Sequence, residues 1–202
     1  MSDKTHPDDK LAKEARSLLE GHVKYFSSYD DHLDASLAKY VGGPKEVKTV
    51  GDLIKDGTMG KVMNDLLEKY LGIVGIKGEM AKEYLRELTL SSEELREMFK
   101  GQLDKKYNLQ VANQLRNQVK SKLHNKLRDT IDNKIQNMTD VDKIKDFVEW
   151  FHKEAGTDYA FPGLREDIKT PVDGLGMYRR AFDTYVNKLD EKATYKKSDK
   201  KK

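Results

Sequence analysis

The sequence of 202 residues has no cysteine, only four prolines and no long apolar run. The absence of cysteine excludes disulfide bonds, thiolate metal sites and cysteine nucleophiles. No apolar run approaches the roughly 20 residues of a membrane-spanning helix. The first ten residues, MSDKTHPDDK, lack the apolar segment of a secretory signal. We therefore expect a protein without a membrane span that acts in the cytoplasm, or within a particle assembled there.

Alternating strand patterns are also missing, while charged residues make up 36% and hydrophobic residues 37% of the chain. This composition favours an all-α protein with a core that is lean for its length. We predict an elongated multi-helix bundle with one long N-terminal helix and one long central basic helix. Because the core is lean, we also expect self-association, which would bury further apolar surface.

The spacing of apolar residues near the N-terminus predicts a helix of more than thirty residues. They run from Leu11 to Tyr40 at an average spacing of about 3.6, the period of a straight amphipathic helix. Asp8 or Asp9 can cap its start, Gly42-Gly43-Pro44 ends it, and Ser27-Ser28 is a place where it can break in two.

Acidic residues are absent from the central stretch Lys105 to Arg128, which contains seven basic residues. From Val111 onward an apolar residue recurs at every fourth position. A helix turns about 100° per residue, so this stripe drifts roughly 40° per repeat and winds about 240° by Ile135. One straight partner cannot cover such a stripe. Either the helix bends or breaks near Ser121, or its two halves pack against different neighbours, one within the chain and one in another subunit.

The remaining places of this repeat are polar. Ten of the thirteen Asn and Gln residues of the protein lie between Asn108 and Asn137, and the basic residues flank the apolar stripe. Lysine and arginine neutralise phosphates, and amides can hydrogen-bond to backbone oxygens or base edges. This pattern predicts a nucleic-acid interface. Its predicted contact residues are Lys105, Lys106, Asn113, Arg116, Asn117, Lys120, Lys122, Lys126 and Arg128.

The chain divides by pattern into four regions that we expect to form one domain overall. They are an N-terminal helical region (1–102), the central basic helix (103–138), a C-terminal helical hairpin (139–192) and a disordered lysine-rich tail (193–202). Ser91 with Glu94 predicts a capping box. Thr139 with Asp142 is expected to start a helix over Asp140 to Ala155, which Gly156 stops. Asp173 is expected to cap a last helix that extends to about Lys192.

Motifs for chemistry are weak. Glu149 and His152 have the spacing of a carboxylate-bridged metal bundle but lack the second copy that such a site requires. His22 lies on an apolar helix face and is interpreted as a packed core residue. Gly57-Thr58-Met59-Gly60-Lys61 lacks the glycine, the hydroxyl residue and the preceding strand of a phosphate loop, so we interpret it as a turn between helices. We predict no catalytic residue, no metal site and no cofactor.

The leading hypothesis is therefore a non-enzymatic, self-associating helical protein that binds or coats nucleic acid, such as a nucleoprotein or a filament-type capsid subunit. The alternative is a helical adaptor or regulator that binds a protein and never touches nucleic acid. That protein would bind to the central apolar seam. A simpler interpretation of the central stretch is a surface helix whose amides join helices in an oligomer and whose bases pair with the acids Asp30, Asp31 and Asp34 or Glu93, Glu94 and Glu97. A third hypothesis, an enzyme with its site at loop 156–171, requires a cleft with converging polar groups.

Overall fold

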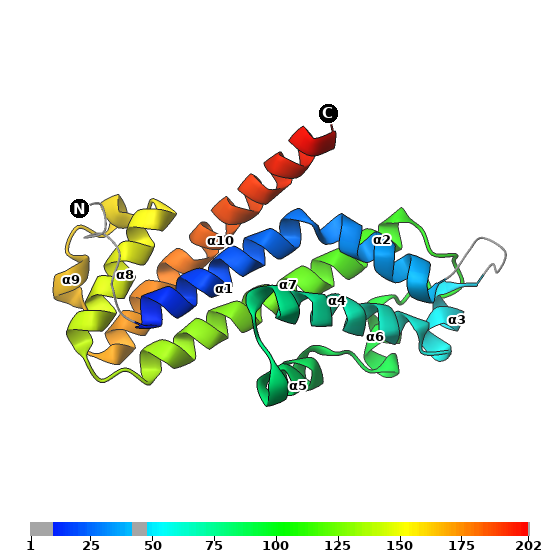
Figure 1. Ribbon diagram of the computed structural model, residues 1–202, viewed down its shortest axis with the longest axis horizontal. Coiled ribbons are helices and arrows are strands. Elements are labelled where there is room, and N and C mark those ends of the chain that lie inside the picture. The colour runs from blue at the N-terminus through cyan, green and yellow to red at the C-terminus, as the bar shows by residue number, and fades with distance from the viewer. Residues whose placement is uncertain (1–9, 42–47, 202) are drawn as a thin grey trace. The chain divides into compact units, whose positions relative to one another are not determined.

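The computed structural model describes residues 10–41 and 48–201, and they are helical apart from turns, loops and one isolated bridge (Figure 1). This confirms the all-α class. In chain order the elements are α1 Lys10–Ser27, α2 Tyr29–Tyr40, α3 Val50–Lys55, α4 Thr58–Val74, α5 Gly78–Leu88, α6 Ser92–Met98, α7 Leu109–Gln136, α8 Val141–Ala155, the 3-10 helix η2 Asp158–Ala160, α9 Leu164–Asp167 and α10 Pro171–Lys201. No helix of the described ranges is long and apolar enough to span a membrane.

The N-terminal helical stretch forms two helices, with the interruption at Ser28. Ser28 has φ −116° and ψ 14°, and the hydroxyl of Ser27 donates a hydrogen bond to the carbonyl oxygen of Lys24 at 2.9 Å. Serine side chains compete with the helical backbone for hydrogen bonds, which accounts for a break at the Ser27-Ser28 pair. The capping residues Asp8 and Asp9 and the segment Gly42-Gly43-Pro44 lie outside the described residues.

Local capping signals set several of the other helix ends. The Ser91 hydroxyl accepts from the Glu94 amide at 3.1 Å, and the Glu94 carboxylate accepts from the Ser91 amide at 3.0 Å, which confirms the predicted capping box. Gly156, with φ 76°, ends α8 after Ala155. Gly57, with φ 86°, lies between α3 and α4, so the turn is shorter than predicted and Thr58 already begins α4.

Contacts between Cα atoms divide the chain into two compact units. The first comprises Met1–Ser27 and His124–Lys202, and the second Ser28–Leu123. This division differs from the four predicted regions, because α7 contributes residues to both units.

In the first unit, α10 packs against both α8 and α1. Its core is rich in aromatic residues. The centroid of the Phe151 ring lies 5.2 Å from that of Tyr178 and 4.6 Å from that of Tyr185. Leu127, Ile131 and Ile135 of α7 belong to the same core. Gly174 allows α10 to approach α8 closely, since a Cβ atom at this position would overlap Cγ2 of Ile144.

In the second unit, α4 packs against α2, α3, α5 and α6 and supplies much of the core. Gly51 of α3 lies close to the backbone of Leu103, and its amide donates to the Leu103 carbonyl oxygen at 2.8 Å. The Val50 amide donates to the Lys105 carbonyl oxygen at the same distance.

These bonds explain why the predicted start of the central helix at Leu103 is wrong. The backbone of residues 103–106 is engaged by α3, and Lys106 forms the isolated bridge with Thr49. The helix begins only at Leu109, after the Asn108 carboxamide oxygen accepts from the Val111 amide at 3.0 Å. From there α7 continues through Ser121 without interruption.

The last helix is longer than predicted at both ends. It begins at Pro171, a favourable residue for a first helical position, and Asp173 lies inside the first turn, where it accepts from the Lys169 and Thr170 amides at 3.0 and 3.1 Å. The helical backbone of α10 includes residues 193–201 of the segment for which we predicted disorder, whereas Lys202 lies outside the described residues. Lysine has good helix propensity, and this segment contains neither proline nor glycine.

Candidate nucleic-acid interface and candidate cavities

The four-residue repeat of α7 appears directly in its pattern of burial. Every apolar residue of the stripe is at most 3% exposed, and the residues diametrically opposite are exposed. The buried residues are Val111, Leu115, Val119, Leu123, Leu127, Ile131 and Ile135. The exposed ridge consists of Asn113, Asn117, Ser121, Asn125, Asp129 and Asn133. The basic residues Arg116, Lys120, Lys122, Lys126 and Arg128 are half-buried, because they lie between stripe and ridge.

The two halves of the stripe are buried in different units. The boundary between the units falls between Leu123 and His124, within α7. Of the two alternatives for a winding stripe, the structure therefore shows different neighbours for each half and no break near Ser121. Both neighbours belong to the same chain, so the stripe gives no reason to expect a second subunit. Self-association stays a prediction.

The two predicted arginines have carboxylate partners. Arg116 Nη1 lies 3.5 Å from Asp30 Oδ1, and the guanidinium carbon lies 5.4 Å from the centroid of the Tyr29 ring. Arg128 Nε lies 3.6 Å from Asp129 Oδ1, and the Arg128 carbonyl oxygen accepts from the Tyr178 hydroxyl at 2.9 Å. Arg116 therefore forms one of the local ion pairs expected if the central helix is an ordinary surface helix.

The predicted lysines fall into two groups. Lys105 and Lys106 are exposed and precede α7, on the backbone segment that pairs with α3. Lys120, Lys122 and Lys126 flank the ridge of α7. Lys122 acts electrostatically on Glu94 of α6, whose pKa is lowered mainly by the hydrogen bond from the Ser91 amide and to a smaller extent by this lysine. The nine predicted residues thus do not form one continuous line on a helix.

The two predicted amides, Asn113 and Asn117, lie on the exposed ridge. Neighbouring amides that point toward the protein have structural roles. Gln102 donates to Gln114 at 2.6 Å, and Gln114 donates to the carbonyl oxygen of Met98 at 2.5 Å. The amides of α7 therefore have two roles. Gln114 bonds to neighbouring segments of the protein, whereas Asn113 and Asn117 form part of the polar outer surface.

A small cavity of about 220 Å³ opens at loop 156–171, where an enzyme site was the third hypothesis. Three of its polar lining residues, Glu149, His152 and Arg165, already have partners within the protein. Arg165 contacts Asp146 at 2.8 Å and Glu149 at 3.2 Å. His152 is buried and uses both ring nitrogens, Nδ1 to the Thr157 hydroxyl and Nε2 to the Met177 carbonyl oxygen, each at 2.7 Å. The Arg165 guanidinium and both ring nitrogens of His152 are therefore engaged by other groups of the protein.

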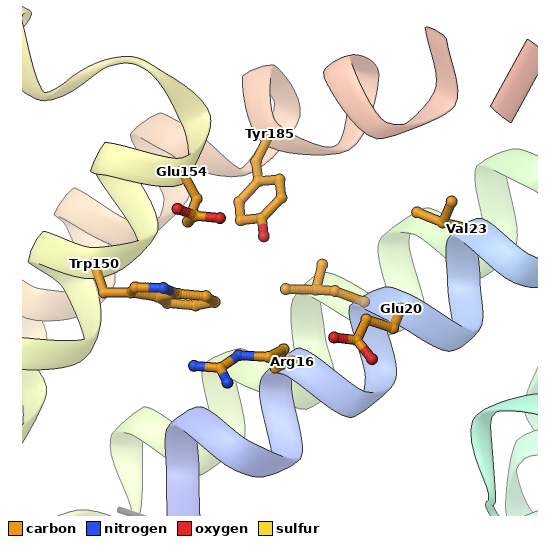
Figure 2. A pocket seen from close by; sticks show the side chains of 7 residues that line it. Arg16, Glu20, Val23, Trp150, Glu154 and Tyr185 are labelled. Atoms are coloured by element: carbon orange, nitrogen blue, oxygen red, sulfur yellow. The ribbon is translucent and has the colours of Figure 1, made fainter. Parts of the chain in front are cut away.

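A larger cavity of about 420 Å³ lies within the first unit (Figure 2). Residues of α1, α8 and α10 line it, and the sequence patterns did not indicate it. The lining residues are Arg16, Leu19, Glu20, Val23, Trp150, Glu154 and Tyr185.

No family model, curated protein or solved structure matches this chain. Its function has to be inferred from its own residues.

Within residues 10–41 and 48–201, no group of three or more His, Cys, Asp or Glu side chains is arranged to hold a metal ion. Glu149 of the Glu149–His152 pair is bound by Arg165, and His22 is fully buried beside Phe26, with ring centroids 4.8 Å apart. The residues of the larger cavity were missed because they come from three helices. The only local signal was the four-residue spacing of Arg16 with Glu20 and of Trp150 with Glu154.

Proposed function

We propose that the protein binds nucleic acid through the outward face of α7, without catalysing a reaction. The observation that carries this proposal is the exposed amide ridge of α7, which has basic residues on both sides and no acidic residue from Leu109 to Arg128. A phosphate backbone laid along this ridge meets amide donors at its centre and cations at either margin.

The proposal assigns the central part of the contact to the turn around Ser121. Lys120 and Lys122 lie on opposite sides of the ridge there, and Asn117 and Asn125 continue it by one turn in each direction. Arg116 and Arg128 each lie beside a carboxylate, of Asp30 and Asp129, that neutralises part of their charge, so their contribution is expected to be smaller. Lys105 and Lys106 are exposed enough to reach an anion, but from a separate segment.

The salt dependence of binding tests the proposal. Fluorescence anisotropy with labelled single-stranded and duplex DNA and RNA should show affinity that falls as salt rises, by about 0.7 log units per log unit of salt for each single-strand phosphate neutralised. The double substitution Lys120→Gln/Lys122→Gln should reduce this slope by about 1.4. The matched control is Lys61→Gln/Lys100→Gln, which removes two exposed lysines from elsewhere in the same unit.

A slope near zero would exclude phosphate contacts, and equal slopes for the two double variants would exclude α7 as the interface. The Arg116–Asp30 ion pair favours the adaptor hypothesis as the second candidate. That function predicts capture of a protein partner that is insensitive to salt and to nuclease treatment.

A further inference from the structure

The larger cavity of the first unit combines apolar walls with charged side chains at its mouth. Leu19 and Trp150 are each 2% exposed and Tyr185 is 7% exposed, so the walls of the cavity are formed by side chains of the hydrophobic core. The rings of Trp150 and Tyr185 have centroids 6.4 Å apart and meet at 63°, as edge-to-face rings do. A volume of about 420 Å³ is within the range of small-molecule sites in proteins.

The charges around this cavity do not neutralise one another. Arg16 and Glu20 are four residues apart on α1, yet they form no ion pair, and neither Glu20 nor Glu154 is ion-paired with any side chain in the described part of the chain. The Arg16 guanidinium lies instead over the Trp150 ring, with its carbon 5.3 Å from the centroid. Lys188 donates to the carbonyl oxygen of Glu154, not to its carboxylate, and does not line the cavity.

The Tyr185 hydroxyl adds a neutral polar group. Figure 2 shows it directed into the space between Trp150 and the residues of α1. Burial and the nearby Glu154 carboxylate raise the pKa of Tyr185 to about 12, so the hydroxyl keeps its proton at neutral pH and can donate or accept a hydrogen bond. Two carboxylates and one guanidinium leave the charged lining with one net negative charge.

We propose that this cavity binds a small organic cation, a primary ammonium carried on an apolar body the size of one ring. The apolar body would occupy the space between Leu19, Trp150 and Tyr185. The ammonium group would donate hydrogen bonds to the Glu20 and Glu154 carboxylates. Charge complementarity selects the cation, because an anion would face two carboxylates and a neutral compound would gain no ion pair with them.

Trp150 is the only tryptophan of the protein, so its fluorescence reports on the cavity directly. The experiment titrates the full chain with phenethylammonium, and in parallel with the neutral 2-phenylethanol and the anionic phenylacetate. Phenethylammonium should change the fluorescence in a saturable manner below about 10 mM, and the two analogues should bind more weakly or not at all. Calorimetry of the same titration provides a second readout.

Substitutions assign the effect to the cavity. Glu20→Gln and Glu154→Gln should each weaken phenethylammonium binding by about threefold to fivefold, because an exposed ion pair contributes up to about 1 kcal/mol. Asp183→Asn, which removes an exposed carboxylate from α10 outside the cavity, should leave binding unchanged. Val23→Phe fills the half-exposed end of the cavity and should abolish binding, while circular dichroism checks that the helices are retained.

Binding of 2-phenylethanol as tight as that of the ammonium compound would overturn the proposal, and so would equal affinity in the Glu and Asp183 variants. The same holds if no saturable signal appears with the wild-type chain. None of these measurements involves the ridge of α7, so their outcome is independent of nucleic-acid binding.

Discussion

Glycine at position 174 is required by packing and not by backbone conformation. The residue lies within the first turns of α10, and a Cβ atom there would overlap the buried side chain of Ile144 in α8. Gly176, two residues farther along the same helix, is exposed and has open space where its Cβ would lie. The two positions separate the steric role of a glycine from its effect on helix propensity.

We expect Gly174→Ala to destabilise the protein by up to about 2 kcal/mol, because overpacking costs about 1–3 kcal/mol and the gain in helix propensity returns about 1 kcal/mol. Gly176→Ala should instead stabilise it by about 0.5–1 kcal/mol. Urea denaturation followed by circular dichroism measures both. Equal stability of the two variants would contradict the close approach of α10 and α8.

At the scale of single elements, the role of the α7 ridge in nucleic-acid binding can be tested by a substitution that leaves the core unchanged. Asn117→Asp places a negative charge between the basic margins while preserving the shape of the side chain, and Asn and Asp have similar helix propensities. If α7 contacts phosphates, the variant should bind nucleic acid about tenfold more weakly at low salt and unfold at nearly the same urea concentration. The matched control, Asn187→Asp on the exposed face of α10, should change neither quantity.

The elements also show what the sequence could and could not predict. The apolar stripe from Val111 to Ile135 was predicted correctly because burial along a helix depends on local periodicity. The start of α7 was predicted incorrectly. The backbone of Leu103 to Lys106 pairs with Gly51 and its neighbours, which lie about fifty residues earlier in the chain.

The two candidate sites also differ in whether they depend on local periodicity or on contacts between distant residues. The ridge of α7 lies on one helix, so its members could be named from the repeat alone. The cavity around Trp150 depends on α1, α8 and α10 meeting in space, and a four-residue spacing within each helix does not report such a meeting. The Arg116–Asp30 ion pair joins residues 86 positions apart and was predicted only as one of several pairings.

For the whole molecule, the histidines and aspartates with lowered pKa values make stability fall as the pH is lowered. Burial lowers the pKa of His32 and of His152 below the ordinary value of 6.5. Hydrogen bonding from Thr58 lowers the pKa of Asp56 to about 2, and the Lys169 amide is the main cause of the lowered pKa of Asp173. In each case the unfolded chain binds the proton more readily than the folded chain, so protonation favours unfolding.

The free energy of unfolding should therefore fall in two stages as the pH is lowered. The first stage begins below about pH 6.5, where the unfolded histidines become charged, and the second extends from about pH 5 toward pH 2, where the carboxylates become protonated. His152 contributes to the first stage because its Nε2–H donates to the Met177 carbonyl oxygen while Nδ1 faces the Thr157 hydroxyl, in a site that disfavours a second proton on the ring.

Urea denaturation between pH 7.5 and 5 measures the first stage, and His152→Gln should reduce its slope, because glutamine does not titrate there. Asp56→Asn should leave that slope unchanged and reduce only the second stage, which makes it the matched control. A slope between pH 7.5 and 5 that is the same in wild type and His152→Gln would mean that this ring accepts a proton as readily in the folded protein as in the unfolded chain. The buried environment of His152 would then not be the cause of any loss of stability in mild acid.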